Sequence, residues 1–291
     1  MMRLRPGVYT ALVTPFNRRG DVDYQRLRDL VEWQIREGVD GLVPVGTTGE
    51  SPTLSFAEHE KVIETVIDAV RGRVIVVAGT GANSTAEALE LTRHAKEAGA
   101  DATLQVTPYY NKPNQEGLYR HFSQVADIGL PVVLYNIPGR CGREIAVETV
   151  VRLAAHPRIV ALKEAGGTVE RVSAVLTRCR IMVFSGDDSL TLPMMAVGAK
   201  GVISVASNVA PRLVGRMVRL ALENRFGEAR RAHLGLYRLF CDLFIDTNPI
   251  PVKAAMAMMG LIEETYRLPL SPLAAPLRQR LRQTLKEVGL V

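Results

Sequence analysis

The sequence is poor in the residues that form disulfides or bind metals. It has three cysteines, Cys141, Cys179 and Cys241, an odd number without a Cys-x-x-Cys pair. This pattern excludes a disulfide framework and gives no sign of a zinc site. The five histidines show neither a His-Glu-x-x-His motif nor paired spacing. We therefore expect a protein that holds no metal.

Long apolar runs are also missing. No uncharged stretch is long enough to cross a bilayer, and the first residues contain no apolar signal-peptide segment, so we expect a cytoplasmic protein without a membrane partner. The net charge is +6, but the basic residues are spread over nearly every expected helix. The densest stretch, Arg278–Arg282, is typical of the exposed face of an amphipathic helix, and we expect no nucleic-acid partner.

Lysine is scarce, with seven lysines against 29 arginines. One of the seven, Lys163, ends the apolar run Ile159–Leu162, which has the character of a buried strand. An unpaired buried ammonium group is costly, and desolvation lowers the pKa of a lysine. The neutral amine is a nucleophile that forms Schiff bases with carbonyl compounds. Lys163 is therefore the first candidate for a catalytic residue.

Short apolar runs alternate with amphipathic helical stretches along most of the chain. Eight runs have strand character: Val8–Val13, Gly41–Val45, Val74–Ala78, Ala102–Val106, Val132–Leu134, Ile159–Leu162, Ile181–Phe184 and Gly201–Val205. Two pairs, Ser55 with Glu58 and Ser84 with Glu87, have capping-box spacing at helix starts. Near-continuously apolar strands indicate a parallel sheet covered by helices on both faces. Eight such units favour a closed (β/α)8 TIM barrel over an open sheet.

We expect the barrel to occupy residues 1–225 and a small helical C-terminal domain to occupy residues 226–291. In such a barrel the active site lies at the carboxyl ends of the strands. These ends are rich in hydroxyl groups and carry one amine: Thr14, Thr47, Thr48, Thr80, Thr107, Tyr109, Tyr110, Tyr135, Asn136, Lys163, Glu164, Ser185, Gly186, Asp187 and Ser204. The set lacks the carboxylate pair of a glycosidase. Tyr135 ends the strand next to that of Lys163, which favours a role in proton transfer.

Several motifs follow one another along the whole chain: Gly46–Glu50, Thr107–Asn111, Tyr135–Pro138 with Arg140, Leu162–Ala165, Ser185–Asp188, Gly201–Ser204 and Asn248–Lys253. Together they resemble the dihydrodipicolinate synthase family. That family belongs to a superfamily of Schiff-base enzymes that includes N-acetylneuraminate lyase. The paired Thr47 and Thr48, with Arg140, resemble the synthases more than the lyases.

The resemblance implies an aldol-type condensation of pyruvate with L-aspartate 4-semialdehyde. The product would be 4-hydroxy-tetrahydrodipicolinate, in lysine and diaminopimelate biosynthesis. It implies no cofactor, because pyruvate itself forms a covalent imine on Lys163. In this reading Tyr135 donates and accepts protons, Thr47 relays them, and Tyr110 connects the relay to solvent.

The resemblance also implies how the substrates are bound. Thr48 would hold the pyruvate carboxylate, and Arg140 would bind the semialdehyde carboxylate through its planar guanidinium. Gly186 would leave room for substrate, and the carbonyl of Ile203 would orient the lysine. In this family the tyrosine that corresponds to Tyr110 reaches into a neighbouring subunit's site. The resemblance therefore implies a homotetramer built as a dimer of dimers.

Two alternatives remain open at this point. The same Schiff base serves aldolases and lyases of 2-keto sugar acids, such as N-acetylneuraminate or keto-deoxy-gluconate. A barrel of another kind could sense pyruvate without catalysis, although the lysine, tyrosine and threonine set argues against it. Arg140 favours a small carboxylated aldehyde over a polyol. Without the resemblance, the residues indicate only a Schiff-base aldolase.

The resemblance implies an inhibitory L-lysine site at a dimer interface, with these contacts: Ser51, Phe56, His59, Asn83, Glu87 and Tyr109. Phe56 stands where a polar ring is common, and loss of one polar contact weakens binding by about 1 kcal/mol. We therefore predict inhibition of weak to moderate affinity. Titration of L-lysine into an activity assay checks this, and full activity at high millimolar lysine would contradict it.

Overall fold

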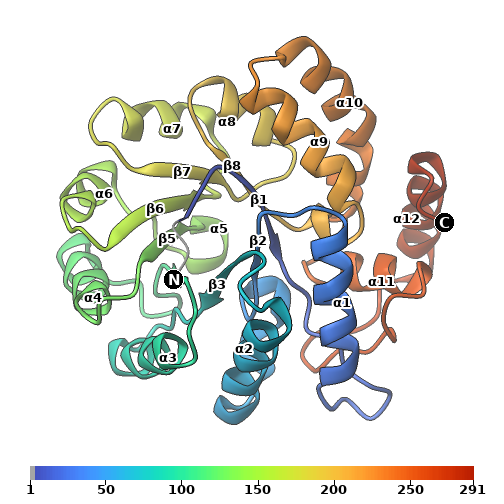
Figure 1. The fold of residues 1–291 in the computed structure, drawn as a ribbon, viewed down its shortest axis with the longest axis horizontal. Helices are drawn as coiled ribbons and strands as arrows, with labels where there is room; N and C mark the ends of the chain where they lie inside the picture. Colours follow the sequence, from blue (N-terminus) through green and yellow to red (C-terminus); the bar gives the residue numbers. More distant parts are fainter. Residues whose placement is uncertain (1–3) are drawn as a thin grey trace.

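A computed structural model describes residues 4–291. Eight parallel strands form a closed barrel in which each strand pairs with the next and β8 pairs with β1 (Figure 1). The strands are β1 (Gly7–Ala11), β2 (Gly41–Val43), β3 (Ile75–Gly79), β4 (Ala102–Val106), β5 (Val132–Asn136), β6 (Ile159–Glu164), β7 (Met182–Ser185) and β8 (Gly201–Ser204). The predicted (β/α)8 barrel is thereby confirmed.

The ends of four strands, β1, β2, β5 and β6, differ from the predicted ends by two residues. β1 ends at Ala11, two residues early, and the backbone N–H of Val13 donates instead to Asn208 Oδ1 at 3.1 Å. β2 ends at Val43, and Val45 beyond it has φ +55°. β5 and β6 run two residues further than predicted, so Tyr135 and Lys163 lie inside the ladder.

The helices around the barrel are α1 (Tyr24–Arg36), α2 (Phe56–Val70), α3 (Thr85–Glu97), α4 (Gln115–Asp127), α5 (Pro138–Cys141), α6 (Val147–Ala154), α7 (Val169–Leu176), α8 (Thr191–Ala196) and α9 (Pro211–Leu222). Three short 3-10 turns occur as well: η1 (Thr47–Gly49), η2 (Ser51–Thr53) and η3 (Ala206–Asn208). None of the helices within residues 4–291 is long and apolar enough to cross a membrane.

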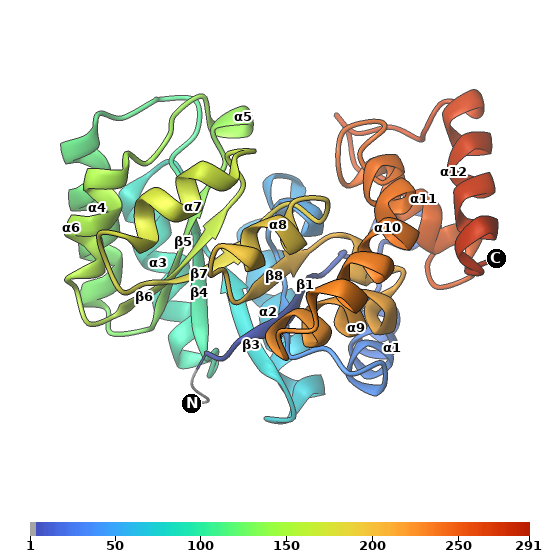
Figure 2. The same ribbon diagram turned by 90° about the horizontal axis from the view of Figure 1, so that it is seen from above.

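The C-terminal part consists of α10 (Phe226–Asp242), α11 (Ile250–Met258) and α12 (Ala275–Val288). Figure 2 shows these helices at one side of the barrel, beside α9 and α1. One apolar cluster runs without a break from barrel residues such as Val202 to tail residues such as Leu285, so the tail packs on the barrel. The tail begins at the residue expected, and its status as a separate domain stays a prediction.

One of the two predicted capping boxes is formed. Ser55 accepts from the backbone of Glu58, and Glu58 accepts from the backbone of Ser55 at 2.9 Å. Ser84 does sit at the N-cap of α3, but its side chain accepts no hydrogen bond from the helix, so the second capping box is wrong. This helix start is held by α4 instead, through a hydrogen bond of 2.9 Å between Thr85 Oγ1 and His121 Nδ1.

Closure of the barrel requires a glycine at the seam between β1 and β8. Gly201 has φ +141°, and a Cβ there would lie 1.9 Å from the carbonyl oxygen of Gly7. We expect Gly201→Ala to lower the free energy of unfolding by about 3 kcal/mol or more, because it adds both backbone strain and a clash with main chain. Thermal or urea unfolding measures this.

Gly235→Ala is the matched control, because Gly235 lies within α10 and a Cβ there meets nothing within 4 Å. Helix propensity makes that variant neutral or up to about 1 kcal/mol more stable. Equal unfolding midpoints for the two variants would contradict the requirement for glycine at position 201.

Candidate active site

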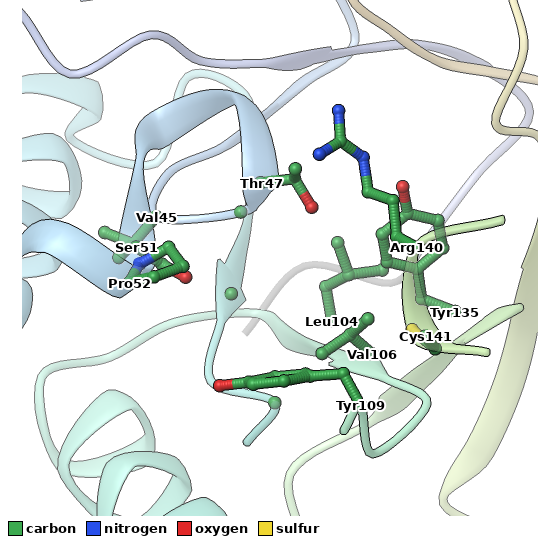
Figure 3. Close-up of a pocket in the computed structure, with 13 residues that line it drawn as sticks. Val45, Thr47, Ser51, Pro52, Leu104, Val106, Tyr109, Tyr135, Arg140 and Cys141 are labelled. Carbon is green, nitrogen blue, oxygen red and sulfur yellow. The ribbon is translucent and has the colours of Figure 1, made fainter. Parts of the chain in front are cut away.

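A cavity of about 190 Å³ opens at the carboxyl ends of the strands. Its walls are formed by Val45, Gly46, Thr47, Ser51, Pro52, Gly79, Gly81, Leu104, Val106, Tyr109, Tyr135, Arg140 and Cys141. Figure 3 shows the polar ends of Thr47, Tyr135 and Arg140 directed toward one space, above the apolar side chains of Leu104 and Val106. Three residues proposed from two separate motifs therefore meet in one site.

Lys163 lies beside this cavity, buried in the barrel interior. It pairs in register with Tyr135 of β5, and its Nζ lies 4.0 Å from the centroid of the Tyr135 ring. Its side chain has the same strand parity as Ala161, which belongs to the apolar cluster inside the barrel. Burial lowers the pKa of Lys163 to about 7; Arg140 lowers it as well, and the charge of Asp188 opposes both. This amine therefore reaches its neutral, nucleophilic form at a much lower pH than an exposed lysine does.

Tyr135 is a buried phenol that stays protonated at neutral pH. Burial raises its pKa to about 12, while the charge of Arg140 and a hydrogen bond with Thr47 oppose that rise. The main-chain carbonyl of Tyr135 accepts from Thr107 Oγ1 at 2.9 Å, so Thr107 braces the strand. Tyr135 can thus donate a proton, and its hydrogen bond with Thr47 connects it to a second hydroxyl group.

Asn248, from the segment before α11, joins two parts of the site. Its side-chain Nδ2 donates to Thr48 Oγ1 at 3.0 Å, and its main-chain carbonyl oxygen accepts from Arg140 Nη2 at 2.8 Å. Asn248 is absent from the site residues chosen from the sequence, because it lies outside the barrel. The motif Asn248–Lys253 was the signal that could have found it.

Asp188 is a second residue missed by the sequence-based choice. Its buried carboxylate accepts from Ser204 Oγ at 2.5 Å and from the N–H groups of Val205 and Ala206 at 3.0 and 2.9 Å. Burial nevertheless raises the pKa of Asp188 to about 6. Above that pH it supplies the negative charge that supports the protonated form of Lys163.

The space around Lys163 requires a glycine. A Cβ on Gly186 would lie 3.0 Å from Lys163 Cε and 2.8 Å from Ala165 Cβ. Gly186 therefore makes room for the lysine itself. Ile203 lies in β8 with its side chain in the barrel interior.

A sequence model described as "Dihydrodipicolinate synthetase family" matches residues 5–288. A protein from Pelobacter propionicus, named 4-hydroxy-tetrahydrodipicolinate synthase, is 54% identical over 288 residues, which cover 98% of this chain and 99% of the relative. The chain belongs to the dihydrodipicolinate synthetase family.

Solved structures of the family superpose closely on this fold. A dihydrodipicolinate synthase from Acinetobacter baumannii, in complex with pyruvate, gives a TM-score of 0.97 at 46% identity, over 99% of this chain and 100% of that one. A lysine-bound relative from Cyanidioschyzon merolae gives 0.96 at 42% identity, over 98% and 99%. A relative described as a monomeric variant gives 0.96 at 40% identity, over 99% and 98%.

Several polar residues at the strand ends serve the scaffold. Glu164 pairs with Arg171 at 2.8 Å on the outer face of β6, so it does not neutralise Lys163. Thr14 Oγ1 donates to the carbonyl of Gly49 at 2.7 Å. Thr80 belongs to a buried hydrogen-bonded cluster with Gln105 and two further threonines. Tyr110 is 90% exposed at φ +70°, outside the cavity of its own chain.

Two of the six residues expected to bind lysine belong to the cavity wall. Ser51 and Tyr109 line it directly, and Phe56 opens α2 with half of its surface exposed. Burial, reinforced by the charge of Glu87, raises the pKa of Tyr109. His59 is buried, which lowers its pKa to about 4, so it is neutral at physiological pH. Asn83 lies before α3 and accepts from Asn111 through its carbonyl at 2.8 Å.

Within the described residues, 4–291, no group of three or more His, Cys, Asp or Glu side chains is arranged to hold a metal ion. The charges that act on Lys163 come instead from one carboxylate and one guanidinium, Asp188 and Arg140.

These charges predict a pH dependence. Imine formation on Lys163 should accelerate as the pH rises through about 7, because only the neutral amine attacks. Asp188 favours the ammonium form, so Asp188→Asn should lower the pKa of Lys163 and move the midpoint to lower pH by about one unit. The measurement is the rate of adduct formation with pyruvate between pH 5 and 9.

Asp187→Asn is the control for this shift, because the Asp187 carboxylate accepts from Ser189 in its own loop at 2.8 Å. That variant should keep the midpoint near 7. A midpoint that stays in place or rises in Asp188→Asn would show that Asp188 does not act on the amine.

Proposed function

We propose that this chain condenses pyruvate, bound as an imine on Lys163, with L-aspartate 4-semialdehyde to give 4-hydroxy-tetrahydrodipicolinate. The observation that carries the proposal is the buried Lys163 amine, whose pKa near 7 leaves it reactive, packed against Tyr135. The relatives named 4-hydroxy-tetrahydrodipicolinate synthase and the pyruvate complex of the Acinetobacter protein support it.

The chemistry begins with attack of the neutral Lys163 amine on C2 of pyruvate. Tyr135 protonates the departing hydroxyl group, and loss of water gives a cationic imine. This imine draws electrons and allows the methyl group to lose a proton to the Tyr135 phenolate, which is thereby ready to donate again. The resulting enamine carbon attacks the aldehyde of the semialdehyde, and the new alkoxide takes a proton from Tyr135. The amino group of the semialdehyde then attacks C2, closes the ring and releases Lys163 as a free amine.

The proton steps use groups whose ionisation suits the task. Tyr135 is a phenol at neutral pH, so it can donate, and its hydrogen bond with Thr47 gives the proton a route outward. We assign Tyr110 as the last member of this relay, supplied by a neighbouring subunit. Its exposed side chain and left-handed backbone support that role, because both leave the ring free to project from its own chain.

Binding of the two carboxylates is assigned to two side chains that Asn248 connects. Thr48 would hold the pyruvate carboxylate, and Arg140 the carboxylate of the second substrate. A planar guanidinium pairs well with a carboxylate. Gly186 clears the space beside the amine, and the carbonyl of Ile203 would orient it.

We infer a homotetramer, arranged as a dimer of dimers, in which Tyr110 crosses between subunits. The monomeric relative shows that assembly varies within the family. We further infer that the reaction needs no cofactor, since the imine itself supplies the electron sink, and that the protein works in the cytoplasm.

Borohydride reduction tests the covalent step. With pyruvate present, reduction should add one pyruvate-derived group to the peptide that contains Lys163 and should abolish activity. Lys163→Ala should lose turnover by a factor of about 10³ or more, since the amine that is proposed to form the imine is removed. Mass spectrometry of the digested protein and an activity assay give the two results.

Lys96→Ala is the matched control, because Lys96 is an exposed lysine on α3 whose Nζ donates to the carbonyl of Ile128 at 2.6 Å. That variant should keep wild-type trapping and turnover. A pyruvate adduct on any lysine other than Lys163, or near-normal turnover of Lys163→Ala, would end the proposal.

The acceptor is tested at Arg140. Arg140→Ala should raise KM for aspartate semialdehyde about 10- to 100-fold, as expected for loss of a charged hydrogen bond. Trapping of pyruvate alone should change much less. Wild-type protein assayed with glyceraldehyde is the comparison: efficient use of that aldehyde, unaffected by Arg140→Ala, would favour the sugar-acid aldolase alternative.

A further inference from the structure

The turn that carries Thr47 and Thr48 is bounded by two strained residues. Val45 has φ +55° and Glu50 has φ +54°, in the left-handed region that L residues rarely adopt. The strain is greatest for a β-branched valine. Inside the turn, the N–H groups of Gly49 and Glu50 donate to the carbonyls of Gly46 and Thr47 at 3.0 and 3.1 Å. Such a conformation persists only where the surroundings enforce it.

Thr14 of the barrel supports the turn through the carbonyl of Gly49, and the C-terminal part of the chain supports its other residues. Lys253, in the first turn of α11, forms an ion pair with Glu50, and both side chains are almost completely inaccessible to solvent. The Lys253 ammonium also lies 4.2 Å from the centroid of the Phe16 ring and 5.3 Å from that of Tyr266. The second carboxylate oxygen of Glu50 accepts from the backbone N–H of Arg267 at 3.4 Å.

The same segment reaches the turn at a second point. Asn248 Nδ2 donates to Thr48 Oγ1 at 3.0 Å, two residues before Glu50. The start of α11 is itself held, since Tyr266 Oη donates to the carbonyl of Ile250 at 3.0 Å. The turn is therefore held from outside the barrel both at Thr48 and at its strained end, Glu50.

We infer that Lys253 is a positioning residue for the condensation. Its ion pair with Glu50 holds the turn in the conformation that places Thr47 beside Tyr135 and Thr48 at the pyruvate carboxylate. This inference rests on the roles of Thr47 and Thr48 given under the proposed function.

A buried ion pair is a costly way to stabilise a fold. Replacement of both partners by neutral side chains of similar size is often harmless to stability, whereas removal of one partner leaves an unpaired charge. The ion pair does fix the orientation of the Glu50 side chain, because its carboxylate must face the Lys253 ammonium. It thereby helps to hold the strained backbone of Glu50 in one conformation. Misplacement of a reacting group by about 1 Å can cost a factor of 10² in rate.

The test separates stability from positioning. Lys253→Met leaves the Glu50 carboxylate unpaired, so both Tm and activity should fall. In the double variant Glu50→Gln/Lys253→Met the charges are gone, and Tm should return most of the way to the wild-type value. Its kcat/KM for pyruvate should stay reduced by about tenfold or more, with both kcat and KM affected, because Thr47 and Thr48 are both displaced.

Asp242→Asn is the matched control. Asp242 is an equally buried carboxylate that accepts from Arg280 Nη2 and Thr284 Oγ1 at 2.5 Å each, between α10 and α12. That variant should lower Tm while kcat/KM stays within about twofold of wild type. Recovery of kcat/KM together with Tm in the double variant would overturn the inference.

The single variant Glu50→Gln gives an independent result should the double variant fail to fold. Its amide oxygen can still accept from the ammonium, so the fold should survive with a lowered Tm, because the buried Lys253 charge has lost its carboxylate partner. The kcat/KM for pyruvate should fall several-fold, because the ion pair that orients the turn is gone. Wild-type kcat/KM in that variant would overturn the inference. Borohydride trapping on wild-type Lys163 keeps the two ideas apart: absence of a wild-type adduct defeats the proposed function, and normal Glu50→Gln kinetics defeat only the positioning role.

Discussion

Burial of the Lys163 amine against the ring of Tyr135 is the interaction on which the site depends. Neighbouring parallel strands bring the two residues into register, so no loop has to be ordered to join them. Removal of water lowers the pKa of Lys163 to about 7 and raises that of Tyr135 to about 12. One packing arrangement therefore yields both a nucleophilic amine and a protonated phenol at neutral pH.

Two neighbouring charges also act on the pKa of Lys163, in opposite directions. Asp188 supports the ammonium form of Lys163, and Arg140 opposes it. In the proposed reaction, the protonated imine formed on Lys163 carries a positive charge at the same place. A buried carboxylate, held by Ser204 and two backbone N–H groups, then lies ready to balance that charge. Asp188, which favours the ammonium form of Lys163, would therefore also stabilise the charged imine of the proposed reaction.

The barrel alone does not complete the site. The strained turn with Thr47 and Thr48 takes support from Asn248 and Lys253, which lie about 200 residues later in the chain. The C-terminal part of the chain therefore contacts the site through one short turn. The second of the C-terminal helices, α11, contributes the buried charge of Lys253 to the rim of the site.

The sequence by itself determined the eight strand-helix units and the position of Lys163. Apolar periodicity reports which residues are buried, and a lone lysine at the end of an apolar strand violates that pattern visibly. It also identified Tyr135, Thr47 and Arg140, through motifs that resemble a family. It failed at the capping of α3, where the contact between Thr85 and His121 took over.

Only the tertiary structure decided what each polar residue faces. Strand parity sends Glu164 outward to Arg171 while Lys163 points inward, and the sequence order alone does not say which side holds the cavity. The roles of Asp188, Asn248 and the Glu50–Lys253 pair depend on contacts between residues distant in the chain. No local pattern encodes such contacts, because they exist only when the barrel has closed and the tail has packed on it.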